Sequence, residues 1–425
     1  MRSWICIISL SAFIVVSCDT ASTIDPPNDS FFLKYYGDDG NQEGVDFVQN
    51  ADGTLTLFGN TGTAPNRQLY LVNVDANGNR VWERTYGGPL DDNAKDIELT
   101  NDGRLVIVSD YDSEPTRDIV IMTLALDGTK IDSTLTGFPS GGSTDEIATS
   151  ITQTDDGFLV AGSTSNVSIK PVDPLNPNPT DTRDALHVRY FDDLTDYSSS
   201  WQKARGPGNF DESAKIVQVS PTQYYFFGYS DRSIGTTGSS DANFYFLGLG
   251  EFGETNTDEY FLANPGSDEI LSSVTIAPPV SGDGFLLSGI TQNAGSSDIY
   301  LVKLRNSLSF TNDDLLVNKN LGANLGAINS TRTSSYPSLS SGFLLLSNTI
   351  DASGNQSFYL DKIDALGNRV WQNPFIYGGA LEDAVGSVQE LPDGSIVIIG
   401  TFAVGDDGEK KMTLIKVNGE GKFLK

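Results

Sequence analysis

The hydrophobic pattern is dominated by short runs of consecutive apolar residues, each placed directly after a turn. Five of the turns are Asp-Gly pairs, such as Asp52-Gly53 and Asp393-Gly394. Runs that are apolar on both faces predict strands buried between neighbouring sheets. The seven predicted strands are Leu55–Gly59, Arg104–Val108, Phe158–Gly162, Tyr225–Gly228, Phe285–Gly289, Phe343–Leu346 and Ile396–Gly400.

Two further strands follow each buried strand. The third strand comes after a loop of variable length, with its clearest copies at Leu69–Val74, Ile119–Leu124, Ile299–Leu304, Phe358–Ile363 and Met412–Val417. A glycine-containing turn then leads to a fourth strand, as at Arg80–Tyr86 and Arg369–Tyr377. Strand units repeating at roughly 50–60 residues indicate stacked copies of one small sheet. The pattern predicts an all-β protein, a seven-bladed β-propeller of four-stranded antiparallel blades.

The two ends of the repeat region predict how the ring closes. Residues Phe31–Gly37 form a lone outer-strand sequence, whereas Gly421–Lys425 is only the beginning of one. An open stack would expose two bare sheet edges. We therefore expect the N-terminal strand to complete the seventh blade.

The amino terminus has the pattern of an export signal. Arg2 precedes a short apolar stretch, Trp4–Val16, and polar sequence follows at once. Val15-Val16-Ser17-Cys18 resembles the lipobox of bacterial lipoproteins, which implies that Cys18 is acylated and becomes the first mature residue. An ordinary secretory signal is the alternative. The predicted parts are a signal peptide (1–17), a lipidated flexible tether (18–30) and the propeller (31–425).

The repeats resemble those of bacterial propeller-repeat lipoproteins and secreted proteins. The shared motifs are Tyr-Gly-Gly, an acid pair, Asp-Gly and Asp-x-x-Gly-x-x-x-Trp, as in Asp75–Trp82. This resemblance implies the fold but little about activity. With the lipobox it implies anchoring to the bacterial outer membrane, on its periplasmic or its outer surface, and a monomeric propeller.

An acid pair precedes the first strand of most blades. We expect these residues to ring the mouth of the central channel, where hard cations such as Ca²⁺ or a basic ligand could bind. The alternative is that each carboxylate accepts backbone hydrogen bonds at the start of the strand. The candidate residues are Asp38, Asp39, Asp91, Asp92, Asp145, Glu146, Asp211, Glu212, Asp268, Glu269, Glu382 and Asp383.

Loop lengths favour one face of the ring for binding. The loops between second and third strands differ between copies, and the longest is Ser163–Asp184. Variable loops are where binding residues usually lie. Strand direction places these loops on the same face as the blade-to-blade connections.

Composition and single motifs limit the function further. The net charge of −29 disfavours a nucleic-acid partner. His187 is the only histidine, which excludes histidine-rich zinc and haem sites. Gly248–Gly253 matches a dinucleotide fingerprint but lies where other copies have a turn, and Trp82, Trp201 and Trp371 are expected to pack between blades.

The sequence favours a membrane-anchored, non-catalytic binding module, with no cofactor apart from the Ca²⁺ considered above. Its predicted partner is an envelope protein or a glycan. A polysaccharide hydrolase or lyase that uses carboxylates at the channel mouth is the alternative, and a structural role in envelope assembly is a third.

Overall fold

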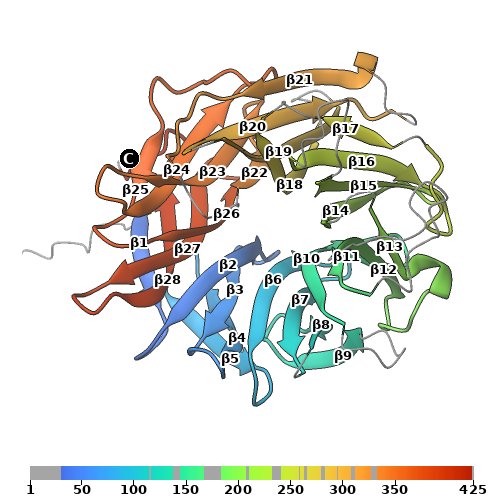
Figure 1. Cartoon of the computed structure of the whole chain (residues 1–425). Helices are drawn as coiled ribbons and strands as arrows, with labels where there is room; N and C mark the ends of the chain where they lie inside the picture. Colours follow the sequence, from blue (N-terminus) through green and yellow to red (C-terminus); the bar gives the residue numbers. More distant parts are fainter. Residues whose placement is uncertain are drawn as a thin grey trace, which may run out of the picture.

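The computed structural model describes most of the chain and contains almost only strands. The described residues are 30–113, 116–136, 144–166, 183–206, 210–231, 241–257, 259–262, 266–278, 283–293, 295–307, 312–326 and 333–423. They form seven four-stranded antiparallel sheets around a common axis, which confirms the predicted propeller (Figure 1). Two short 3₁₀ turns, Ser199–Trp201 and Asn312–Asp314, are the only helical segments in these ranges.

Blades 1 to 6 each run from an innermost to an outermost strand in chain order. Blades 1 to 3 consist of β2 (Gln42–Gln49), β3 (Leu55–Thr61), β4 (Gln68–Val74) and β5 (Arg80–Tyr86); β6 (Asp92–Leu99), β7 (Leu105–Asp112), β8 (Arg117–Leu124) and β9 (Lys130–Thr136); β10 (Glu146–Gln153), β11 (Gly157–Thr164), β12 (Asp184–Phe191) and β13 (Lys203–Arg205). Blades 4 and 5 consist of β14 (Asp211–Ser220), β15 (Gln223–Ser230), β16 (Asn243–Leu249) and β17 (Tyr260–Leu262); β18 (Asp268–Ala277), β19 (Gly284–Asn293), β20 (Ser296–Leu304) and β21 (Leu315–Asn320).

The last two blades complete the ring. Blade 6 consists of β22 (Thr333–Pro337), β23 (Phe343–Ile350), β24 (Gln356–Ile363) and β25 (Phe375–Tyr377). Blade 7 consists of β26 (Ala384–Glu390), β27 (Ile396–Val404), β28 (Glu409–Val417) and, as its outermost strand, β1 (Phe32–Tyr36). The predicted fourth strand Arg369–Tyr377 is therefore too long. Its first part forms a turn, with one isolated bridge between Ile363 and Arg369.

Four of the five Asp-Gly turns place glycine in a backbone conformation that other residues avoid. Gly53 and Gly394 have φ angles of +84° and +79°. The preceding Asp52 carboxylate accepts the backbone N–H of Thr54 at 2.9 Å, which holds the turn. These turns and the third-to-fourth turns lie on one face of the ring, here called the turn face. The second-to-third loops and the blade connections lie on the opposite loop face.

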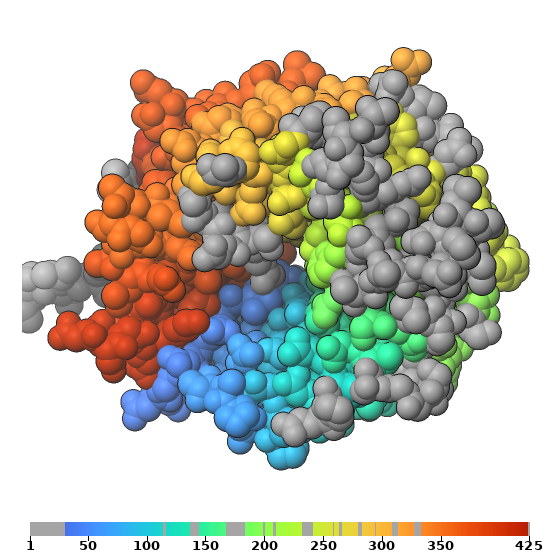
Figure 2. Space-filling view, viewed as in Figure 1, coloured from blue at the N-terminus to red at the C-terminus, as the bar shows by residue number. Residues whose placement is uncertain are grey.

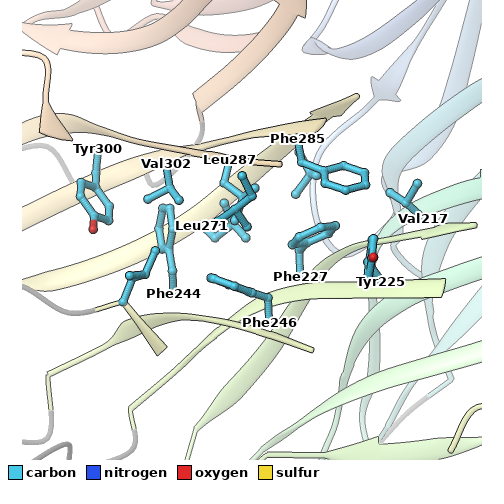
Figure 3. Packing of buried hydrophobic residues seen from close by; sticks show 13 residues of the cluster. Val217, Tyr225, Phe227, Phe244, Phe246, Leu271, Phe285, Leu287, Tyr300 and Val302 are labelled. Carbon is cyan, nitrogen blue, oxygen red and sulfur yellow. The ribbon is translucent and has the colours of Figure 1, made fainter. Parts of the chain in front are cut away.

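The core consists of seven hydrophobic clusters of described residues, one at each interface between adjacent blades. Figure 3 shows the aromatic interface between blades 4 and 5, where the Phe227 and Phe285 rings lie 5.1 Å apart. Each fully buried side chain of this size contributes about 1.5–3 kcal/mol. Because every cluster draws on two blades, no blade has a complete core of its own.

The predicted closure by the N-terminal strand is confirmed. β1 pairs antiparallel with β28, from Phe32 opposite Lys416 to Tyr36 opposite Met412. Figure 2 shows the first residues of the ring bordering the last. Phe32 and Tyr36 are buried in the cluster between blades 7 and 1.

Deleting Phe31–Tyr36 should lower the melting temperature sharply, because it removes a whole strand and two aromatic side chains from the closing interface. Thermal unfolding followed by circular dichroism measures the effect. Deleting residues 19–29, which precede the strand, is the matched control and should leave the melting temperature unchanged. Equal melting of the two variants would contradict the role of β1 in closure.

Candidate functional site

The acid pairs predicted at the channel mouth form hydrogen bonds to the second-to-third loops on the loop face. They bind each loop where it enters the third strand, a position that we call the loop base. The first acid accepts the backbone N–H of the residue at the start of the third strand in the preceding blade. Asp91 accepts from Arg67 at 2.7 Å and Asp268 from Ala242 at 2.8 Å. The pair also donates in return, since the N–H of Asp92 bonds to the carbonyl of Arg67 at 2.8 Å. Two hydrogen bonds thus fix each such loop base.

The second acid is buried in four of the six pairs, namely Asp92, Glu146, Glu269 and Asp383. The Gly88 N–H donates to Asp92 and the Gly379 N–H to Asp383, both at 3.0 Å. Burial raises the pKa of Asp92 to about 6, despite the bond from Gly88. Glu146 and Glu269 accept from threonine hydroxyls of the second strand, at 2.7 and 2.9 Å.

The remaining members of the predicted ring differ in their surroundings. Asp145 accepts the N–H of Arg117 at 3.0 Å. Asp211 is buried and Glu212 half-buried, and burial raises the pKa of Glu212. Asp38, Asp39 and Glu382 are exposed, and the loop base of blade 7 is instead bonded by Asn41, which accepts the Lys410 N–H at 2.9 Å.

None of the twelve acids lines the cavity within the central channel. Among the described residues, no group of three or more His, Cys, Asp or Glu side chains is arranged to hold a metal ion. The hydrogen bonds show what most of these carboxylates do in the fold. Their binding of Ca²⁺ or a basic ligand stays a prediction.

The channel itself contains a polar cavity that sequence reasoning missed. All seven innermost strands line it, and its volume is about 400 Å³. A β-bulge in β2, β6, β10, β14, β18 and β26 interrupts the pairing at matching positions. Such a bulge re-aims the side chains that follow it. We call the residues at this level the axial ring: Asp46, Asp96, Ser150, Lys215, Ser273, Ser334 and Ser387.

Polar side chains of the inner strands join neighbouring blades. Asp96 of blade 2 accepts the N–H of Ile151 in blade 3 at 2.9 Å, and Ser150 donates to the Ala214 carbonyl of blade 4 at 2.9 Å. The Ser335 N–H of blade 6 donates to Ser273 of blade 5 at 3.2 Å. These bonds satisfy backbone groups that no strand of the same blade can reach.

The charged side chains of the channel gather on blades 1, 2 and 4. Burial and then the adjacent Asp46 carboxyl raise the pKa of Asp96 well above its ordinary value. Lys215 reaches from blade 4 to Glu98 of blade 2, with 3.3 Å between Nζ and Oε1. Burial opposes the charge of Lys215, but the three neighbouring carboxylates outweigh it and raise the pKa of the ammonium group.

The remaining candidate motifs have structural roles. Gly250–Glu254 closes the turn between β16 and β17, with Gly253 at φ +70°, so the glycine-rich motif is a turn as expected. His187 is fully buried, its ring 5.9 Å from that of Trp201 in an edge-on contact. Trp82, Trp201 and Trp371 belong to hydrophobic clusters between blades, as expected. No helix among the described residues is long and apolar enough to span a membrane.

These features define a seven-bladed β-propeller with a polar axial cavity. No protein-family model matches the chain. No curated protein matches it either. Many solved structures do, at low identity.

Three of these structures illustrate the likeness. A protein of unknown function from Dyadobacter fermentans is 10% identical, with 90% of this chain and 97% of that chain covered and a TM-score of 0.49. A serine-to-alanine variant of puromycin hydrolase, complexed with PGG, is 10% identical, with 87% and 53% covered and a TM-score of 0.50. The β-propeller domain of the trilobed protease from Pyrococcus furiosus is 9% identical, with 91% and 98% covered and a TM-score of 0.43. At these identities the likeness shows the fold alone.

Asp96→Asn should stabilise the protein at pH 8 and have little effect at pH 4. The native state holds the Asp96 proton more tightly than the unfolded state does. The stability that this proton contributes is therefore complete below the ordinary carboxyl pKa, and it is lost as the pH rises through the raised pKa of the native state. Asparagine keeps an acceptor for Ile151 and carries no charge. The expected gain in melting temperature at pH 8 is about 2 °C or more.

Asp127→Asn is the matched control for this pH series. The backbone N–H of Thr129 lowers the pKa of the exposed Asp127, so its substitution should give no gain at pH 8. Equal melting curves for Asp96→Asn and the wild type at both pH values would disprove the raised pKa.

Proposed function

We propose that this chain is a lipid-anchored lipoprotein of the bacterial outer membrane whose propeller is a non-catalytic binding module for an envelope protein or a glycan. The export signal and Cys18 support the anchor. Both lie outside the described residues. Two or three acyl chains hold a protein firmly on a membrane, whereas one does not.

The observation that carries the proposal is the side from which the chain enters the ring. Ser30 and Phe31 border a surface cavity together with Asn77, Gly394 and Asn418, which all belong to turns of the turn face. The described chain therefore begins at the turn face. We propose that an anchor attached there places the membrane on that side, with the loop face directed away from it.

The tether is long enough to separate the propeller from the lipid. The stretch from residue 18 to residue 30 can span at most about 45 Å, since an extended chain covers about 3.3–3.6 Å per residue. The turns of the turn face carry Asp52, Asp75, Asp102 and Asp127, and hydrogen bonds lower the pKa of each of these carboxyls. Their negative charge keeps the turn face from lying flat against anionic lipids.

The loop face is thus the surface available to a partner. It carries the second-to-third loops, whose bases the acid pairs hold in place by the hydrogen bonds described above. A rigid base under loops of unequal length is the arrangement on which scaffold folds build binding sites. The anchor also raises the local concentration of the propeller for partners on the same membrane.

One observation favours the alternative of a polysaccharide-acting hydrolase or lyase. Burial raises the pKa of Asp96 well above its ordinary value, beside Asp46 in the channel, and a glycosidase uses one carboxyl group with a raised pKa together with a second carboxyl group. Release of reducing sugar from envelope glycans by the wild type, and its loss in Asp96→Asn, would establish this alternative in place of a binding function.

The anchor and the orientation are tested together. Cys18→Ser should move the protein from the membrane to the soluble fraction. For orientation, a fluorophore attached at Asn66→Cys on the loop face or at Asn77→Cys on the turn face is combined with acceptor-labelled lipids. We expect stronger energy transfer from position 77. Equal transfer, or stronger transfer from position 66, would refute the orientation.

Partner binding is tested with photo-crosslinking residues at the same two positions in the full, membrane-anchored chain. A defined partner should be crosslinked from position 66 in stoichiometric amounts and not from position 77. The same protein on a glycan array covers the second class of partner. Crosslinking from neither position, together with no glycan retained, would disprove the proposed function.

A further inference from the structure

The axial cavity has no part in the proposed function, and its lining is chemically divided. Charged side chains come from blades 1, 2 and 4, whereas blades 3, 5, 6 and 7 contribute hydroxyl groups. The hydroxyl-bearing residues are Thr149, Ser150, Ser272, Ser273, Thr333, Ser334, Ser335, Tyr336 and Ser387. At about 400 Å³ the cavity has the size of a small-molecule site rather than of a few buried waters.

Each lysine of the cavity lining is paired with another acid, which leaves Asp46 and Asp96 without a lysine of their own. Lys95 forms an ion pair with Asp110 at 2.8 Å, and Lys215 forms one with Glu98 at 3.3 Å. Asp46 and Asp96 lie within hydrogen-bonding reach of each other, with Lys215 as their nearest shared positive charge. Two carboxyl groups this close repel each other when both are ionised, so a cationic group between them is favoured.

A hydroxyl group beside this pair has no partner. The Oγ atom of Ser387 is shielded from solvent and makes no hydrogen bond to any described residue. Ser387 lies on β26, whose neighbour in the ring is β2 with Asp46; Gln389 of β26 donates to the Phe47 carbonyl of β2 at 3.1 Å. A buried hydroxyl without a hydrogen bond costs stability unless a ligand or water satisfies it.

We propose that the axial cavity binds a small polyhydroxylated amine, of the chemical class of amino sugars. Its ammonium group would lie between Asp46 and Asp96, and its hydroxyl groups would bond to Ser387 and to the serines of blades 5 and 6. This site depends neither on the lipid anchor nor on the loop face.

Proton release distinguishes this site from a neutral sugar site. An ammonium group beside Asp96 opposes the raised pKa of that carboxyl, so binding favours release of a proton from Asp96 to the buffer. The other charged groups facing this pair are Glu98 and Lys95 on β6 and Lys215 on β14, and each already has an ion-pair partner. Binding should therefore strengthen as the pH rises from 5 towards neutrality, and weaken again once the ligand's own ammonium group loses its proton.

The test is titration calorimetry of the purified full chain with D-glucosamine, in phosphate and in Tris buffer at the same pH. The apparent enthalpy should differ between the buffers by an amount that reports the released proton. Asp46→Asn should weaken binding at least tenfold and Ser387→Ala several-fold. Asp155→Asn, an exposed carboxylate on the turn face, is the matched control and should bind like the wild type.

D-Glucose and CaCl₂ are titrated in parallel. Glucose, which lacks the ammonium group, and Ca²⁺, which lacks hydroxyl groups, should bind at least tenfold more weakly than glucosamine. Equal binding of either probe, no heat with glucosamine, or unchanged binding in both Asp46→Asn and Ser387→Ala would overturn the proposal. Melting curves show whether each variant is folded. If Asp46→Asn does not fold, the binding measured for Ser387→Ala decides the test.

Discussion

The fold depends on how the innermost strand of each blade is completed. Such a strand pairs on one side only, so its other edge presents backbone N–H and C=O groups to the channel and to the next blade. In a closed ring these groups are partly buried and need partners. The protein supplies them from side chains, as when Asp96 accepts the Ile151 N–H and Ser334 the Val388 N–H at 3.4 Å. The seven apolar interfaces hold the blades together, but these polar bonds set the spacing at the axis.

This solution has a chemical consequence. An inner edge completed by short polar side chains produces a channel lined by hydroxyl and carboxyl groups, whereas apolar side chains would have left the edge unsatisfied. The residues that complete the ring and the residues that could bind a ligand are therefore in part the same. Asp96 illustrates this, since it bonds to Ile151 and also faces Asp46. Substituting it changes the stability of the protein together with the chemistry of the cavity.

The sequence was sufficient for the architecture but not for the axial ring. Asp-Gly turns, doubly apolar second strands and the spare strand at Phe32 are local signals that need no tertiary context, and the structure confirms what they predict. The fourth strand of blade 6 was predicted too long because Arg369–Trp371 continue a strand-like pattern through a turn. The channel residues escaped prediction because a bulge inserts one residue into the inner strand, and alternation then no longer tells which side chains face the axis. Asp46, Asp96 and Lys215 were visible in the sequence as charges inside strands, which is the signal that could have identified them.

The near-equivalence of the blades distinguishes the roles of two sets of carboxylates, the acid pairs and the aspartates of the axial ring. A feature that recurs in nearly every blade, such as the acid pair, is explained by what every blade shares, namely a loop base that needs two hydrogen bonds. Asn41 supports this reading, because an uncharged side chain performs the same task where blade 7 meets blade 1. The axial ring behaves in the opposite way: seven equivalent positions carry two aspartates, one lysine and four serines. Blade geometry alone would be satisfied by serine at all seven positions. The departure from that repetition, confined to blades 1, 2 and 4, is what makes the channel asymmetric and able to distinguish the charged end of a ligand from its hydroxyl groups.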